Sequence, residues 1–183
     1  DEVAEYFNTR KPESIDVTNI PLKFLYHSEK KRVVLPIRND YNGLVGAIGR
    51  SVDNSKVKTY NYFGVKTSKC LVGHEFTDAD KIMVVEGVTD MANAYEKTIK
   101  TGNSFNIYAT LTASLSQWQA IQLIDMCKPI FMAFDMDKPG RRGQYEALKL
   151  LDSLGATVIV NVSWTKVKDV GEMGIKQFSE VFS

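Results

Sequence analysis

The strongest constraint on the fold is an alternation of short apolar segments with helical segments, which begins at about residue 71. Each of the first three apolar segments is followed by a helical segment, and the apolar segments lie at residues 82–85, 105–109, 129–134 and 156–162. This alternation is typical of β–α–β units, in which helices cover a buried parallel sheet. We therefore expect an α/β domain with a mostly parallel sheet over residues 71–183.

Two helices of this domain are expected to bury an apolar stripe against the sheet. The first stripe contains Val88, Met91, Tyr95 and Ile99, and the second contains Tyr145, Leu148, Leu151 and Leu154. Glycine residues, Gly102 and Gly155, mark the expected ends of the two helices.

Residues 1–70 have a different pattern and are expected to form a separate small subdomain. A short polar helix is predicted over residues 1–10, with a connector after it. Three segments with strand character follow, at residues 32–38, 44–50 and 56–62. Asn42-Gly43 lies in the turn between the first two. Because Asn-Gly between apolar runs is a strong hairpin signal, we expect an antiparallel meander here.

Charge is distributed unevenly along the chain, although the net charge is only +1. Residues 23–69 contain ten Lys or Arg and three Asp or Glu (net +7), whereas residues 70–183 contain 11 and 14 (net −3). This asymmetry suits a protein that binds polyanions on one surface and divalent cations on another. For the charge run alone, a solvated lysine-rich sheet face is the alternative.

From this sequence we expect neither membrane insertion nor secretion. No apolar stretch approaches the length of about 20 residues that spans a bilayer, and the two cysteines show no paired spacing. We expect a cytoplasmic protein without membrane insertion.

Acidic residues recur at the C-terminal ends of the apolar segments. Glu86 follows the first segment, and Asp135 and Asp137 follow the third. The strand period of two directs the last two carboxylates to the same side. Because an open α/β sheet builds its binding site at the carboxyl ends of its strands, we expect these three acids to lie in one site.

The chemistry of this set favours a divalent metal. Clustered carboxylates are the hard oxygen ligands that Mg²⁺ and Mn²⁺ prefer. Asp90, one helical turn beyond Glu86, and Asp169 in the last loop extend the set. Each acid taken alone also has a structural interpretation, since Asp137 could simply cap the helix that begins near Pro139.

Two segments resemble the Toprim signature shared by primases, topoisomerases and some nucleases. They are residues 85–90, Val-Glu-Gly-Val-Thr-Asp, and residues 134–140, Phe-Asp-Met-Asp-Lys-Pro-Gly. Residues 35–50 and the Lys58-Thr59-Tyr60 element are similar to the strands that precede Toprim in bacterial and phage primases. The loop at 168–173, Lys-Asp-Val-Gly-Glu-Met, resembles a phage primase loop that has Asn where this chain has Gly171.

The resemblance implies a Toprim fold, a Rossmann-like and mostly parallel sheet flanked by helices, preceded by a small basic antiparallel subdomain. It also implies a DNA primase catalytic core, a DNA-directed RNA polymerase that makes short RNA primers from NTPs on single-stranded DNA during replication. The catalytic residues by this resemblance are Glu86, Asp135 and Asp137, and the ligands of Mg²⁺ or Mn²⁺ are these three with Asp90 and Asp169. The residues that contact NTP and template phosphates are Arg50, Lys58, Lys66 and Lys69.

The resemblance further implies a replicative helicase and a zinc-binding module as partners, and we expect the zinc module to lie outside this chain. Two alternatives remain open at the level of sequence. A metal-dependent Toprim nuclease shares the acids but has no need of the basic meander. A non-catalytic nucleic-acid-binding Toprim module gains nothing from carboxylates that repel each other.

Overall fold

The computed structural model describes residues 2–9, 20–38, 43–53, 55–74 and 79–182. Within it the chain divides into two compact units, Asp1–Lys66 and Thr67–Ser183. Most of the predicted connector at 11–21, and Asn42 of the predicted hairpin turn, lie outside the described residues.

The described part of the first unit contains a four-stranded antiparallel sheet, with strand order β1-β2-β3-β4, and one short helix. The structure thus confirms the antiparallel meander and adds a three-residue strand at its edge that the sequence pattern did not indicate. The elements are α1 (Glu2–Asn8), β1 (Leu25–His27), β2 (Arg32–Arg38), β3 (Leu44–Ser51) and β4 (Thr59–Tyr62).

The second unit contains a five-stranded sheet with strand order β5-β7-β6-β8-β9. The last four strands in this order run parallel, and only the edge strand β5 is antiparallel. The mostly parallel sheet is therefore confirmed. Its strands are β5 (Val72–His74), β6 (Lys81–Val85), β7 (Phe105–Ala109), β8 (Ile130–Met132) and β9 (Ile159–Asn161).

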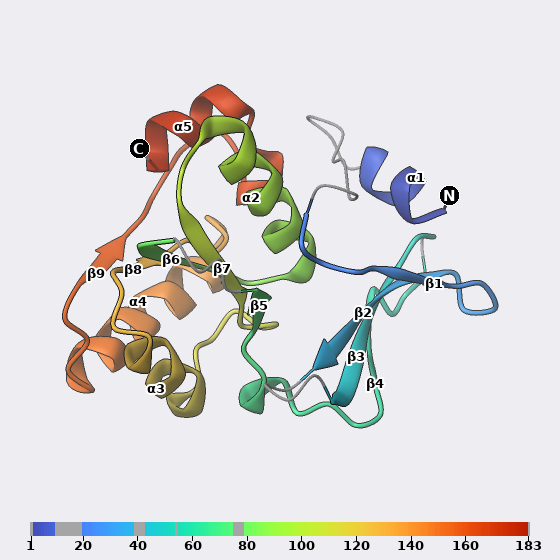
Figure 1. Cartoon of the computed structure of the whole chain (residues 1–183), viewed down its shortest axis with the longest axis horizontal. Helices are drawn as coiled ribbons and strands as arrows, with labels where there is room; N and C mark the ends of the chain where they lie inside the picture. The colour runs from blue at the N-terminus through green and yellow to red at the C-terminus, as the bar shows by residue number, and fades with distance from the viewer. Residues whose placement is uncertain (1, 10–19, 39–42, 54, 75–78, 183) are drawn as a thin grey trace. The chain divides into compact units, whose positions relative to one another are not determined.

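Helices cover both faces of this second sheet. Figure 1 shows α2 and α5 on one side of the strands and α3 and α4 on the other. The helical elements are α2 (Val88–Thr101), α3 (Gln117–Asp125), α4 (Lys138–Ser153) and α5 (Ile175–Phe182), with 3₁₀ turns η1 (Thr67–Lys69) and η2 (Val170–Glu172). No helix in the described part of the chain is long and apolar enough to cross a membrane.

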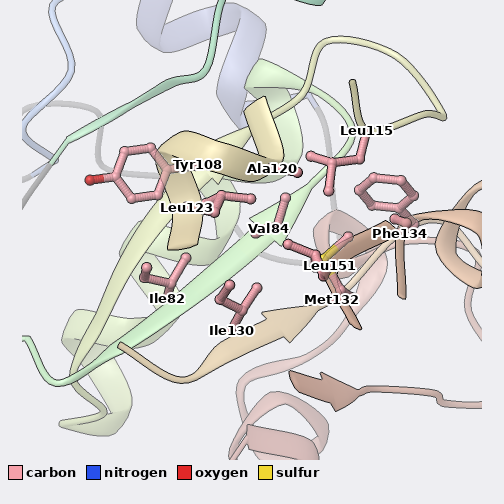
Figure 2. Close-up of a cluster of buried hydrophobic side chains, with 11 residues drawn as sticks. Ile82, Val84, Tyr108, Leu115, Ala120, Leu123, Ile130, Met132, Phe134 and Leu151 are labelled. Carbon is pink, nitrogen blue, oxygen red and sulfur yellow. The ribbon is translucent and has the colours of Figure 1, made fainter. Parts of the chain in front are cut away.

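The core under α3 and α4 follows from the alternation of side chains along each strand. Ile82 and Val84 of β6 point into it with Ile130 and Met132 of β8, as Figure 2 shows. The helices and the segments next to the strands contribute Leu115, Ala120, Leu123, Phe134, Ala147 and Leu151. Met83 and Val85, the intervening residues of β6, are equally buried, so that both faces of this strand are covered.

The predicted helix stripes are only partly right. Val88, Met91 and Tyr95 are buried, but Ile99 in the last turn of α2 is 50% exposed, so this part of the prediction was wrong.

In α4 the buried positions are Gly140, Gly143, Gln144, Ala147 and Leu151, whereas Tyr145 is 56% exposed. Two glycines account for this rotation of the buried face, because a Cβ atom at Gly143 would collide with the carbonyl oxygen of Ala113, and one at Gly140 with that of Asp135. The close approach of helix and backbone therefore decides which face of α4 is buried.

The strand order creates a switch point at β6. The chain passes from β6 to β7 on one side and then crosses to β8 on the other side of β6. The intervening helices α2 and α3 lie on opposite faces of the sheet (Figure 1). In open α/β sheets ligands bind in the crevice outside the carboxyl ends of the strands at such a point.

Candidate metal centre

Glu86 directly follows β6 and lies at this switch point. Its carboxylate Oε1 accepts a hydrogen bond of 3.1 Å from the backbone N–H of Asp135, which follows β8. Burial raises the pKa of Glu86 to about 7, and the negative charges of Asp135 and Asp137 act in the same direction. Glu86 is therefore a carboxyl group whose charged form the site disfavours.

Asp135 and Asp137 lie beside Glu86, as predicted from their position after a strand. Asp137 is the N-cap of α4, and its Oδ1 accepts a hydrogen bond of 3.0 Å from the N–H of Gly140. Asp137 therefore caps α4, as the structural interpretation predicted, but the cap uses only one oxygen of this carboxylate. The backbone between the two acids is held by Arg141, whose Nε donates to the carbonyl oxygen of Met136 at 2.7 Å.

The remaining oxygen of Asp137 faces a cation of the chain itself. Lys168 Nζ lies 3.4 Å from Asp137 Oδ2 and 2.8 Å from Asp135 Oδ2. The hydrogen bond to Asp135 is the largest cause of the raised pKa of Lys168, so the ammonium is charged at neutral pH. The two carboxylates therefore converge on one positive charge.

Asp169 and Asp90 lie next to this group on the neighbouring loop and helix. Asp169 caps the 3₁₀ turn η2, since its Oδ1 accepts a hydrogen bond of 2.9 Å from the N–H of Glu172. Burial is the main cause of the raised pKa of Asp169, and the negative charge of Asp135 adds to it. A Cβ atom at Gly171 would lie 3.0 Å from Oδ1 of Asp169 and 3.3 Å from Oδ1 of Asp90, so glycine allows both acids to pack closely against this turn.

The turn itself is anchored by a buried lysine. Lys97 of α2 is only 3% exposed, and its Nζ donates to the carbonyl oxygens of Val170 at 2.8 Å and Gly171 at 3.1 Å. A buried ammonium needs such partners to offset its desolvation. These contacts hold the loop that carries Lys168 and Asp169 against α2.

The chemistry of these residues fits a divalent cation. Among the residues that the structure describes, no three Asp, Glu, His or Cys side chains are arranged so that they alone could hold a metal ion. Mg²⁺, however, is commonly bound by one or two carboxylates together with waters and substrate phosphates. The contact of one ammonium with both Asp135 and Asp137 indicates that these two carboxylates can share a cation.

The predicted phosphate-binding residues are distributed over the two units. Arg50 lies on β3 and donates from Nη1 to Thr59 Oγ1 at 2.8 Å. Lys58 and Lys66 are exposed residues of the same unit. Lys69 is exposed at the end of η1 and belongs to the second unit.

Three residues of this region were not selected from the sequence. Lys168 was part of the recognised loop, and its place next to Asp169 was a usable signal. Gln144 is a polar residue in the buried stripe of α4, where its Oε1 accepts from the N–H of Phe134 at 2.7 Å and its Nε2 donates to the carbonyl oxygen of Val162 at 2.7 Å. Lys97 had no local signal, because lysines are normally exposed.

A comparison with known families and curated proteins agrees with the resemblance. Residues 83–173, from β6 to the end of η2, match the Toprim-like family. The DNA primase of Aquifex aeolicus is 28% identical over 141 residues, which are 70% of this chain and 26% of that protein. The chain thus spans about a quarter of the length of this curated relative.

Solved structures share the fold. The Aquifex aeolicus primase, comprising zinc-binding and RNA polymerase domains, superposes with a TM-score of 0.72 at 24% identity, over 98% of this chain and 53% of that chain. A DnaG primase catalytic domain bound to single-stranded DNA superposes with a TM-score of 0.66 at 19% identity, over 87% of this chain and 53% of that chain. These similarities confirm the predicted Toprim fold and its preceding antiparallel sheet.

Proposed function

We propose that this chain, whose residues 83–173 match the Toprim-like family, is the catalytic core of a DNA primase of the bacterial or phage type. In the proposed reaction it copies single-stranded DNA into short RNA primers from NTPs during DNA replication. One observation carries the proposal: Glu86, Asp135 and Asp137 lie together at the switch point of the sheet. The similarity to a DNA primase over 70% of the chain supports it.

Asp135 and Asp137 are the residues proposed to bind Mg²⁺ or Mn²⁺, with Asp90 and Asp169 completing the acidic set. Such an ion, when bound, neutralises phosphate charge and activates the attacking hydroxyl. The chain itself positions the ligands: the cap on α4 orients Asp137, and the N–H of Asp135 orients Glu86. Glu86, which the N–H of Asp135 holds beside the ligands, is the carboxyl group proposed for acid–base catalysis.

Nucleic acid and nucleotide are the proposed partners of the basic residues. Arg50, Lys58, Lys66 and Lys69 are proposed to contact the phosphates of NTPs and of the template, since Arg and Lys bind phosphate through charge-assisted hydrogen bonds. The bond from Arg50 to Thr59 leaves the other guanidinium nitrogen groups to reach a phosphate. A replicative helicase and a zinc-binding module are the further partners we propose, in the cytoplasm.

A primer-synthesis assay tests the proposal directly. The chain is incubated with single-stranded DNA, labelled NTPs and Mg²⁺ or Mn²⁺, and the products are resolved by size. We expect template-dependent ribonucleotide products and a loss of about 100-fold or more in Asp135→Asn, because removal of a metal ligand removes several kcal/mol of transition-state stabilisation. Asp152→Asn, which removes a charge from an exposed position of α4, is the matched control and should retain activity.

Other outcomes of this assay favour the alternatives. Metal-dependent cutting of the DNA, without RNA products even when a short RNA primer is supplied, would identify a nuclease. Binding of single-stranded DNA that is unaffected by metal and by Asp135→Asn, with neither products nor cutting, would identify a non-catalytic module.

A further inference from the structure

The position between Asp135 and Asp137 is taken by a side chain of the chain itself. Lys168 Nζ lies 2.8 Å from one carboxylate and 3.4 Å from the other. We propose that Lys168 is a built-in competitor of the divalent cation, whose ammonium leaves the carboxylate pair before both carboxylates bind the metal. This inference rests on the proposed metal site and goes beyond it by naming a residue that limits its affinity.

The oxygens involved make the competition direct. Asp137 Oδ1 is used by the N–H of Gly140 at 3.0 Å, so Oδ2 is the oxygen left to bind a cation, and this is the oxygen that Lys168 contacts. Asp135 likewise presents Oδ2 to the same ammonium. A divalent ion on these two oxygens would be repelled by an ammonium that stayed in contact with them.

The loop that carries Lys168 does not need to open for the exchange. Its backbone is tied to the site, because the carbonyl oxygen of Lys168 accepts from the N–H of Met136 at 2.6 Å. It is also tied to α2, because buried Lys97 donates to the carbonyl oxygens of Val170 and Gly171. The Lys168 side chain, by contrast, is 50% exposed. Rotation of this side chain into solvent is therefore the movement that frees the carboxylates.

Competition of this kind has a defined consequence for affinity. The apparent dissociation constant of the metal rises in inverse proportion to the fraction of molecules in which the ammonium has left the pair. A nucleotide triphosphate that arrives with the metal gives the released ammonium a new anionic partner. Metal alone should therefore bind more weakly than metal together with nucleotide.

Titration of Mn²⁺ into the whole chain without nucleotide tests the proposal, with free Mn²⁺ measured by electron paramagnetic resonance. Lys168→Met should bind Mn²⁺ about 5-fold more tightly, as expected from removal of one adjacent positive charge. Lys166→Met removes an exposed charge from the same loop and should stay within about twofold of the unsubstituted chain. Lys168→Arg keeps the charge and should bind Mn²⁺ no more tightly than the unsubstituted chain.

Thermal unfolding in EDTA supplies the second readout. Lys168→Met should unfold at a lower temperature than the unsubstituted chain, because the carboxylates then lack a counterion, and Mn²⁺ should raise its unfolding temperature by more. A lower unfolding temperature without tighter Mn²⁺ binding would mean a purely structural role for Lys168 and would overturn the proposal.

The metal site and the competition can fail separately. If Asp135→Asn abolishes Mn²⁺ binding but Lys168→Met leaves it unchanged or weaker, the metal site stands and the competition is refuted. If neither the unsubstituted chain nor Lys168→Met binds Mn²⁺ at millimolar concentration, the metal site fails, and the inference fails with it.

Discussion

Phe134 and Asp135 are consecutive residues that belong to two regions with opposite physical requirements. Phe134 is fully buried in the cluster under α3 and α4, and Asp135 lies at the sheet edge with Glu86 and Asp137 (Figure 2 shows the buried side). Burial of the ring lowers the free energy of the folded state. Clustered carboxylates raise the free energy of the folded state unless cations such as the Lys168 ammonium offset their repulsion. Two neighbouring residues just after β8 thus have different roles: Phe134 stabilises the fold, and Asp135 contacts a cation.

The largest effect is expected from breaking the apolar region. Phe134→Ala should lower the free energy of unfolding by about 3–5 kcal/mol, because it removes buried surface and leaves a cavity. Urea denaturation measures this loss. Tyr145→Ala is the control, since Tyr145 is 56% exposed, and should change stability by no more than about 0.5 kcal/mol. Equal effects of the two substitutions would show that Phe134 does not contribute to the core.

An intermediate effect is expected at Gln144, which binds the backbone N–H of Phe134, the residue before Asp135. Gln144→Leu leaves the N–H of Phe134 and the carbonyl oxygen of Val162 without their buried partner, and should lower the free energy of unfolding by about 1–3 kcal/mol. Because Phe134 precedes Asp135, the substitution should also weaken Mn²⁺ binding. Denaturation and Mn²⁺ titration measure the two effects. Gln117→Leu, at an exposed position of α3, should produce neither.

The smallest effect, an increase in stability, is expected at Glu86 in the carboxylate cluster. Glu86→Gln keeps an Oε1 acceptor for the N–H of Asp135 but removes a charge next to two carboxylates. In EDTA it should raise the free energy of unfolding by about 1 kcal/mol or less, as expected for partly screened charges. Thermal unfolding with EDTA and with Mn²⁺ measures the change, and Glu146→Gln on the exposed face of α4 is the control. A loss of stability for Glu86→Gln in EDTA would contradict the view that repulsion between Glu86 and the two aspartates dominates in this cluster.

Much of the fold was predictable because its signals are local. The apolar runs that became β6, β7 and β8 and the caps of the helices depend on residues a few positions apart. The short edge strands β1 and β5, each of three residues, had no such signal because their structure depends on their partner strands. The apolar stripe with Leu148 and Leu151 predicts that Tyr145 is buried, but the packing of Gly140 and Gly143 against the backbone leaves Tyr145 exposed.

The acidic residues of the candidate site were also predictable from local signals, but its lysines were not. Glu86, Asp135 and Asp137 were selected because they follow apolar strands, and the structure places them together. Lys168 and the buried Lys97 were not predicted as parts of the site. The place of Lys168 next to Asp169 was a usable signal, but neither lysine shows in the sequence which distant atoms it contacts. Lys168 lies 33 and 31 positions from the two aspartates that it contacts.

The sequence by itself determined the α/β alternation, the separate antiparallel meander and the strand-end position of the acids. Each of these is a property of period or spacing along a few residues, and periodicity is local. Only the tertiary structure decided that β6 lies between β7 and β8, so that Glu86 meets the N–H of Asp135, 49 residues away. It also decided that Lys168 lies between the carboxylates. Strand order and ion pairing depend on which distant segments meet, and the physical cause is the packing of helices on both faces of the sheet.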